Sequence, residues 1–147
     1  MDNPVATMLE KLKAETAAAA AALQKEGVLP EGALVDFDAE IPKDVAFGDF
    51  STNFAMKHAR VFHRSPRDIA TAVAERLRGA EYVENVTVAG AGFINFTMND
   101  DYFRAVYDEK IKTKHHSVAL FYVIRKLLEI LCALHKSGRA YSTVRPA

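Results

Sequence analysis

The segment Gly90-Ala91-Gly92 constrains the fold most, because it joins two stretches that both read as β-strands. The first covers residues 82–89 and the second residues 93–98. In the second stretch alternate residues fall on opposite faces: Ile94, Phe96 and Met98 on one, Phe93, Asn95 and Thr97 on the other. Gly90 and Gly92 supply the conformational freedom of a tight turn, so the pattern predicts a hairpin with one core-facing side.

Helices are predicted on both sides of this hairpin. Asn3-Pro4 and Ser65-Pro66 each pair an N-cap residue with a proline suited to the first helical position. The expected helices cover residues 4–24, 49–63, 66–78, 101–110 and 118–134. Strands and helices do not alternate strictly, which favours an α+β fold. We expect a small antiparallel sheet of three to four strands with helices packed on one face, plus a C-terminal helical appendage.

Residues 34–41 alternate between apolar and acidic side chains. Val35, Phe37, Ala39 and Ile41 fall on one face. Asp36, Asp38 and Glu40 fall on the other. The alternation predicts a half-buried strand with a solvated acidic face, ended by Pro42.

Phe93 and Asn95 form the first candidate site. On an open sheet face they would present an aromatic ring beside an amide, a combination that can hold one unstacked nucleobase. The alternative is that another helix covers this face, which would make Phe93 a core residue and Asn95 a satisfied buried amide. The pattern alone leaves both readings open.

Lys57, Arg60 and Arg64 form the second candidate site. They are spaced as one basic stripe on the expected helix 49–63. The stripe is either a set of phosphate contacts or an ordinary exposed helix face. Before it, Gly48 is predicted to form a turn and Asp49 to cap the helix.

Charge and motifs exclude several classes of protein. Nineteen basic residues balance nineteen acidic ones, so nucleic-acid binding would need a local basic patch. The sequence contains no phosphate-binding loop or dinucleotide fingerprint, and its histidines lack zinc-ligand spacing, so we expect no metal and no cofactor in this chain. The lone Cys132 suits a reducing compartment, and its apolar neighbours Leu131, Ala133 and Leu134 predict that it is packed. No apolar run predicts a membrane span. We therefore expect a cytoplasmic location and no membrane partner.

Three segments, in this order and spacing, resemble the N-terminal additional domain of arginyl-tRNA synthetase, a class I enzyme. They are Phe47-Gly48-Asp49-Phe50-Ser51-Thr52-Asn53-Phe54-Ala55, Ser65-Pro66-Arg67-Asp68-Ile69-Ala70 and Val88-Ala89-Gly90-Ala91-Gly92-Phe93-Ile94-Asn95-Phe96. The family usually carries histidine where Phe47 stands and proline where Ala91 stands. The resemblance covers about residues 1–110.

The resemblance implies a module that binds arginine tRNA, and not DNA, at the D-loop. In the family the aromatic ring and the amide of the last segment meet a D-loop nucleotide, which implies this role for Phe93 and Asn95. Lys57, Arg60 and Arg64 are then the expected phosphate contacts.

The family's catalytic motifs do not occur in this sequence. No residue is assigned to catalysis, and ATP and magnesium belong to the parent enzyme. We expect a synthetase-like domain over residues 1–110 and a separate segment over 111–147. The alternative function is a protein-interaction or self-association module that uses the helix at 118–134.

Overall fold

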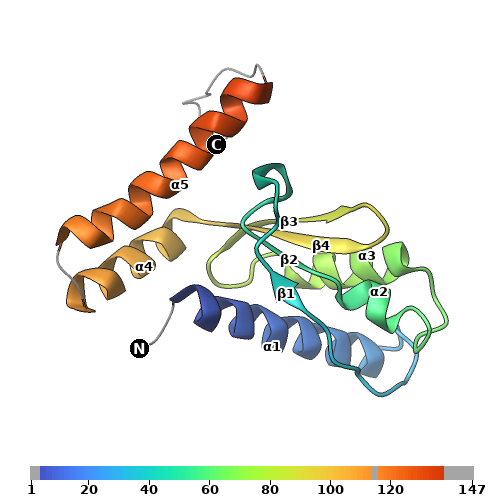
Figure 1. Cartoon of the computed structure of the whole chain (residues 1–147). Helices are drawn as coiled ribbons and strands as arrows, with labels where there is room; N and C mark the ends of the chain where they lie inside the picture. The colour runs from blue at the N-terminus through green and yellow to red at the C-terminus, as the bar shows by residue number, and fades with distance from the viewer. Residues whose placement is uncertain (1–3, 114–115, 138–147) are drawn as a thin grey trace. The chain divides into compact units, whose positions relative to one another are not determined.

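The computed structural model describes residues 4–113 and 116–137 (Figure 1). By compactness the chain divides between Tyr102 and Phe103. The predicted boundary at residue 110 lies further along, inside helix α4 (Asp100–Thr113). Among the described helices, none combines the length and the apolar character needed to cross a membrane.

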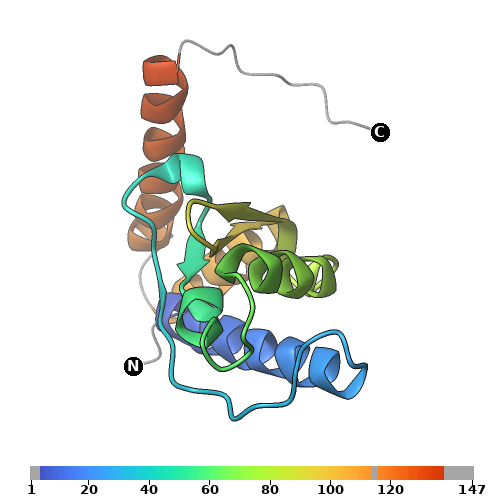
Figure 2. The same ribbon diagram turned by 90° about the vertical axis from the view of Figure 1, so that its right-hand side faces the viewer.

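The first unit is an α+β fold, as predicted. Its antiparallel sheet has the order β1-β2-β4-β3. Its strands are β1 (Ala39–Glu40), β2 (Phe50–Thr52), β3 (Val83–Ala89) and β4 (Phe93–Met98). Its helices are α1 (Pro4–Lys25), α2 (Phe54–His58) and α3 (Pro66–Leu77), with a short 3-10 helix η1 (Val45–Phe47). Helices α1, α2 and α3 lie on one side of the sheet and the η1 loop on the other (Figures 1 and 2).

The β3–β4 hairpin forms as predicted and defines the two faces of the sheet. Phe96 is paired with Phe50 of β2 and with Val86 of β3, and all three side chains are buried toward the helices. Their neighbours along the strands point to the opposite face, where Asn95 is paired with both Ser51 and Thr87. The predicted core side of β4 is therefore confirmed.

Helix α3 is held against the hairpin turn. Ser65 Oγ accepts a hydrogen bond from Asp68 N at 3.1 Å, which confirms the predicted N-cap. A Cβ atom on Gly92 would lie 2.8 Å from Pro66 Cβ, so this close contact requires glycine. The turn before β4 and the start of α3 are therefore in direct contact.

The predicted strand at 34–41 is wrong over most of its length. Only Ala39 and Glu40 pair with β2, which itself has three residues. Val35 and Ile41 are exposed, whereas Phe37 is buried. A partner strand this short offers few backbone groups, so side chains supply most of the polar contacts of residues 35–38.

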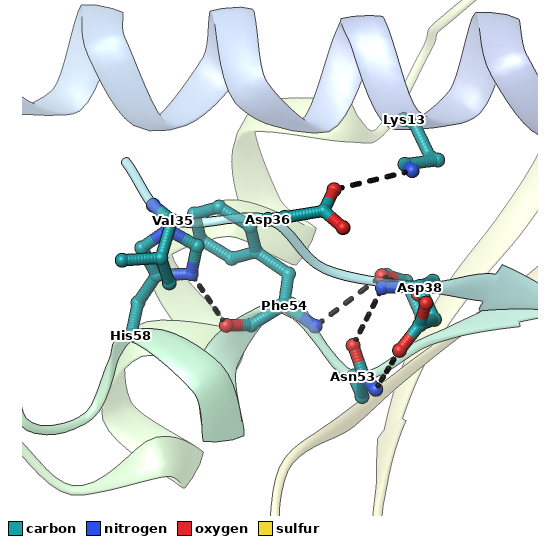
Figure 3. Close-up of polar contacts among 8 residues, drawn as sticks. Lys13, Val35, Asp36, Asp38, Asn53, Phe54 and His58 are labelled. Carbon is teal, nitrogen blue, oxygen red and sulfur yellow. Dashed lines mark hydrogen bonds and ion pairs between the residues drawn. The ribbon is translucent and has the colours of Figure 1, made fainter. Parts of the chain in front are cut away.

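Figure 3 shows these side-chain contacts. The Asn53 amide bonds both ways with Asp38: Oδ1 accepts from the backbone N at 2.9 Å, and Nδ2 donates to the carboxylate at 3.1 Å. His58 Nε2 accepts from Val35 N at 2.9 Å, while Nδ1 donates to Phe54 O at 2.8 Å. The His58 ring is fully buried and stacks on Phe54, so a neutral imidazole satisfies both neighbours.

The predicted helix at 49–63 is also wrong at both ends. Phe50–Thr52 forms strand β2, and the helix covers only Phe54–His58. The apolar residues Phe50 and Phe54 fit a helical spacing, but Phe50 and Thr52 fit a strand spacing equally well. Pairing with β4 decides in favour of the strand.

Beyond Tyr102, the predicted helices at 101–110 and 118–134 both occur. They correspond to α4 (Asp100–Thr113) and α5 (His116–Ser137). Cys132, predicted to be packed, is exposed on α5. Other apolar residues whose side chains are described on α5, including the neighbouring Leu131, are exposed as well.

Candidate functional site

A cavity of about 360 Å³ lies on the face of the sheet opposite the helices. We call it the sheet cavity. It is lined by Glu40, Pro42, Lys43, Asp44, Phe47, Ser51, Ala89, Gly90, Phe93 and Asn95. Both predicted base-contacting residues, Phe93 and Asn95, therefore line one cavity.

Phe93 supplies an accessible aromatic ring in this cavity. Its side chain is 37% exposed, so the reading of Phe93 as a core residue is wrong. The ring directly follows the turn, and its cross-strand partner is the small Ala89, which leaves room beside it. A ring that keeps this much exposed surface beside a cavity is available for stacking.

Asn95 differs from the prediction of an open, outward-facing amide. It shares the face of Phe93 but is only 4% exposed, because Ser51 and Thr87 flank it on the neighbouring strands. Its Oδ1 accepts a hydrogen bond from Ser51 Oγ at 2.7 Å. Each reading is therefore half right: the amide is buried and bonded, yet it also lines the cavity.

The η1 loop brings a second aromatic residue, Phe47, to the sheet cavity. Asp44 starts η1 by accepting from Ala46 N at 2.9 Å. Phe47 ends it, with a side chain that is 49% exposed. Gly48 then passes so close to β4 that a Cβ atom would lie 2.6 Å from Phe96 O.

Asp49 fixes this loop to β4 rather than capping a helix. Its backbone N donates to Phe96 O at 2.8 Å, and its Oδ2 accepts from Met98 N at 2.8 Å. The predicted helix cap is wrong because residue 50 begins a strand, and the carboxylate satisfies a strand amide instead. The predicted turn at Gly48 is present, with a φ of 89°.

Lys57, Arg60 and Arg64 lie outside the lining of the sheet cavity. All three are exposed, but α2 ends at His58, so they do not form one stripe on a single helix. His63, directly before Arg64, has a φ of 49°, which is outside the range of a right-handed helix. The basic residue that does line the cavity is Lys43.

Sequence reasoning missed Phe47, Ser51 and Lys43 as lining residues. Phe47 directly precedes Gly48-Asp49, and an aromatic residue beside a predicted turn is a weak signal for a residue that lines a site. Ser51 becomes visible only once the register of β2 against β4 is known. Lys43 has no local signal, since its position depends on how the η1 loop folds over the sheet.

The comparisons with known proteins agree on one family. Residues 8–98 match the family model described as the arginyl tRNA synthetase N terminal domain. An arginine–tRNA ligase of Caldanaerobacter subterraneus is 32% identical over 145 residues, covering 98% of this chain and 22% of that protein. One from Bacillus pumilus is 38% identical over 95 residues, covering 64% of this chain and 17% of that protein. The chain thus spans about a fifth of the length of these relatives.

Solved structures show the same fold. The arginyl-tRNA synthetase of Plasmodium falciparum matches with a TM-score of 0.52 at 16% identity, over 67% of this chain and 17% of that one. The Thermus thermophilus arginyl-tRNA synthetase matches with a TM-score of 0.50 at 24% identity, over 69% of this chain and 15% of that one. At these identities the likeness concerns the fold.

Proposed function

Since this chain belongs to the arginyl-tRNA synthetase N-terminal domain family, we propose that it is a tRNA-binding module that recognises the D-loop of arginine tRNA. The observation that carries this proposal is the sheet cavity, which both Phe93 and Asn95 line. The module would support the attachment of arginine to tRNA. The catalytic motifs for that reaction do not occur in this sequence. A cytoplasmic location, where tRNA is charged, is part of the same proposal.

The dimensions and chemistry of the sheet cavity suit one nucleobase. Ligand pockets commonly measure about 300–1,000 Å³, and this cavity of about 360 Å³ is at the small end. Phe93 offers a ring for stacking, and Phe47 offers a second apolar wall. Asn95 lies among them as the amide that would contact the edge of the base.

A binding titration with arginine tRNA tests this proposal. Phe93→Ala should weaken binding by about 1–3 kcal/mol, the usual contribution of one base stacked on an aromatic ring. Asn95→Ala should weaken it as well, and a tRNA with an altered D-loop should bind as poorly as the variants do. A matched control is Val28→Ala, which truncates a similarly exposed apolar side chain outside the cavity. Wild-type affinity in folded Phe93→Ala would contradict the proposal.

Lys57, Arg60 and Arg64 are proposed to contact tRNA phosphates away from the base. All three are exposed, and none forms an ion pair within the part of the chain that the structure describes. Each phosphate contact that is lost should lower the dependence of log K on log salt by about 1. The salt dependence of Arg60→Ala, compared with that of the wild type, tests this role, and an unchanged slope would remove Arg60 from the interface.

Helix α5 favours a second candidate function, self-association. Ile124, Leu127, Leu128 and Leu131 are exposed and follow a helical spacing of i, i+3, i+4 and i+7. A stripe of this kind typically packs against another apolar surface. Sedimentation over a range of concentrations tests it: a mass that rises with concentration supports association, and a constant monomer mass contradicts it.

A further inference from the structure

We propose that Ser51 is a positioning residue that fixes which end of the Asn95 amide faces the sheet cavity. This inference rests on the proposed function, because it concerns how the same cavity would read a base. It assigns to Ser51 the task of holding the Asn95 carbonyl oxygen, so that the amino group is the end left to donate.

The geometry of the pair supports this assignment. Ser51 and Asn95 are direct cross-strand partners in β2 and β4, and their side chains point to the same face. Both are buried, at 5% and 4% exposure, so water competes poorly for their hydrogen bond. Ser51 Oγ donates to Asn95 Oδ1 at 2.7 Å, a normal length for a bond from a hydroxyl.

The amino group of Asn95 is the uncommitted part of this pair. No hydrogen bond from Nδ2 is found among residues 4–113 and 116–137, although Asn95 lines the sheet cavity. An amide group has two donors on its nitrogen, and a polar group at a cavity wall binds best when a ligand satisfies it. The ligand edge beside Asn95 should therefore present an acceptor, either a carbonyl oxygen or a ring nitrogen.

The sheet supplies a matched comparison in Thr87. Thr87 is the other cross-strand partner of Asn95, on β3, and it also carries a hydroxyl. No side-chain hydrogen bond joins Thr87 to Asn95 in the described residues, and Thr87 is exposed. Removing the hydroxyl from Ser51 should therefore change the Asn95 amide, whereas removing it from Thr87 should not.

The first experiment follows the Asn95 side-chain NH2 resonances by NMR in the nitrogen-15-labelled full chain, without tRNA. Ser51→Ala should shift or broaden this pair, Ser51→Thr should keep it, and Thr87→Val should leave it unchanged. If Ser51→Ala does not fold, Ser51→Cys retains the size of the side chain with a weaker donor and should also shift the pair. Unchanged Asn95 resonances in the folded Ser51 variant would overturn the inference.

The second experiment measures binding to arginine tRNA transcripts that carry each of the four bases at single D-loop positions. Ser51→Ala should lose about 2- to 10-fold in affinity for the preferred base, as expected for one hydrogen bond. It should also reduce the ratio between the preferred base and the others. Phe93→Ala should instead weaken all four similarly, because stacking tolerates any base. An unaltered ratio in Ser51→Ala would overturn the inference.

The two experiments separate this inference from the proposed function. If the wild type does not bind tRNA, or if Asn95→Ala binds as the wild type does, the proposed function fails. The NMR comparison of Ser51→Ala with Thr87→Val still decides whether Ser51 orients the amide, because it needs no ligand.

Discussion

The two sides of the sheet are built in different ways. The β3–β4 hairpin is local in sequence: a glycine turn joins two alternating strands, and Gly92 packs on Pro66. The β1–β2 side is short and irregular, and contacts from distant residues hold it, such as His58 to Val35 and Asp49 to Met98. The sheet cavity lies where the two sides meet, since Ser51 comes from β2 and Phe93 from β4. The β3–β4 hairpin, formed by neighbouring residues, thus carries the Phe93 ring. The β1–β2 side, held by distant residues, forms the wall of the cavity beside it.

Removing the buried imidazole should have the largest effect on this arrangement. His58→Ala should destabilise the fold by about 3–5 kcal/mol, as for other buried rings, because it leaves a cavity beside Phe54 and removes the acceptor for Val35 N. Urea unfolding measures the loss, and amide exchange should show early opening around Val35. His135→Ala, which truncates an exposed histidine, should stay within about 0.5 kcal/mol of the wild type. Equal effects of the two variants would contradict the role of His58.

Pushing the η1 loop away from β4 should cause the next largest loss of stability. Gly48→Ala places a Cβ atom 2.6 Å from Phe96 O at a φ of 89°, so we expect a loss of about 2–3 kcal/mol. Gly27→Ala is a matched control: its φ is 74°, but nothing lies within 4 Å of the new atom, so only about 1–2 kcal/mol should be lost. Thermal unfolding of both variants measures the difference, and identical losses would show that the approach to β4 is not restrictive.

Alkaline pH should lower the stability of the fold through Tyr102, a residue that contacts both sides of the sheet. The Tyr102 ring packs edge-on against Phe50 of β2 and Tyr82 before β3. Burial, and then the charge of Asp49, raise the pKa of Tyr102 to about 12. The pKa of Tyr102 in the folded chain lies above the ordinary value of about 10. The contribution of the neutral Tyr102 to the free energy of unfolding is therefore complete below pH 10 and is lost as the pH rises toward 12. The loss should be on the order of 2 kcal/mol.

Stability curves from pH 8 to 12 test this expectation, with Tyr102→Phe as the comparison. The difference in unfolding free energy between wild type and Tyr102→Phe should change in the alkaline range, since phenylalanine cannot ionise. Parallel curves for the two proteins would contradict the raised pKa.

Loss of the α3 cap should have the smallest effect. Ser65→Ala removes the acceptor for Asp68 N and should cost about 1 kcal/mol. Thr71→Ala, on the same helix, removes a hydroxyl that only bonds back to Arg67 O, so its effect should be close to zero. Both are measured by urea unfolding, and a Ser65→Ala loss no larger than that of Thr71→Ala would mean that the cap contributes nothing.

Local features of the sequence were sufficient to predict the α+β fold, the hairpin and the start of α3. Ser65 and Pro66 determine the structure of residues close to them in the sequence, and so does the alternation of residues 93–98. The local sequence is therefore enough to predict these elements. Strand β2 and the short helix α2 were missed because the spacing of Phe50 and Phe54 fits both a helix and a strand. Only the pairing of β2 with β4 decides between them.

The candidate site was predicted in the same uneven way. The alternation of β4 placed Phe93 on the face away from the core, but it left open whether that face is covered. The burial of Asn95 depends on Ser51 and Thr87 of neighbouring strands. Phe47 and Lys43 reach the cavity through the η1 loop, whose path depends on Gly48 meeting β4. Residues whose position depends on the register of distant segments could not be found from spacing alone.

The measurement that tests the central claim most directly is a double-mutant cycle between the protein and the tRNA. Wild type and Phe93→Ala are titrated against arginine tRNA and against versions in which each D-loop nucleotide in turn lacks its base. If the sheet cavity holds one of those bases, removing that base and truncating Phe93 should together weaken binding no more than either change alone. Additive losses at every D-loop position would contradict the account, because Phe93 would then contact no base there.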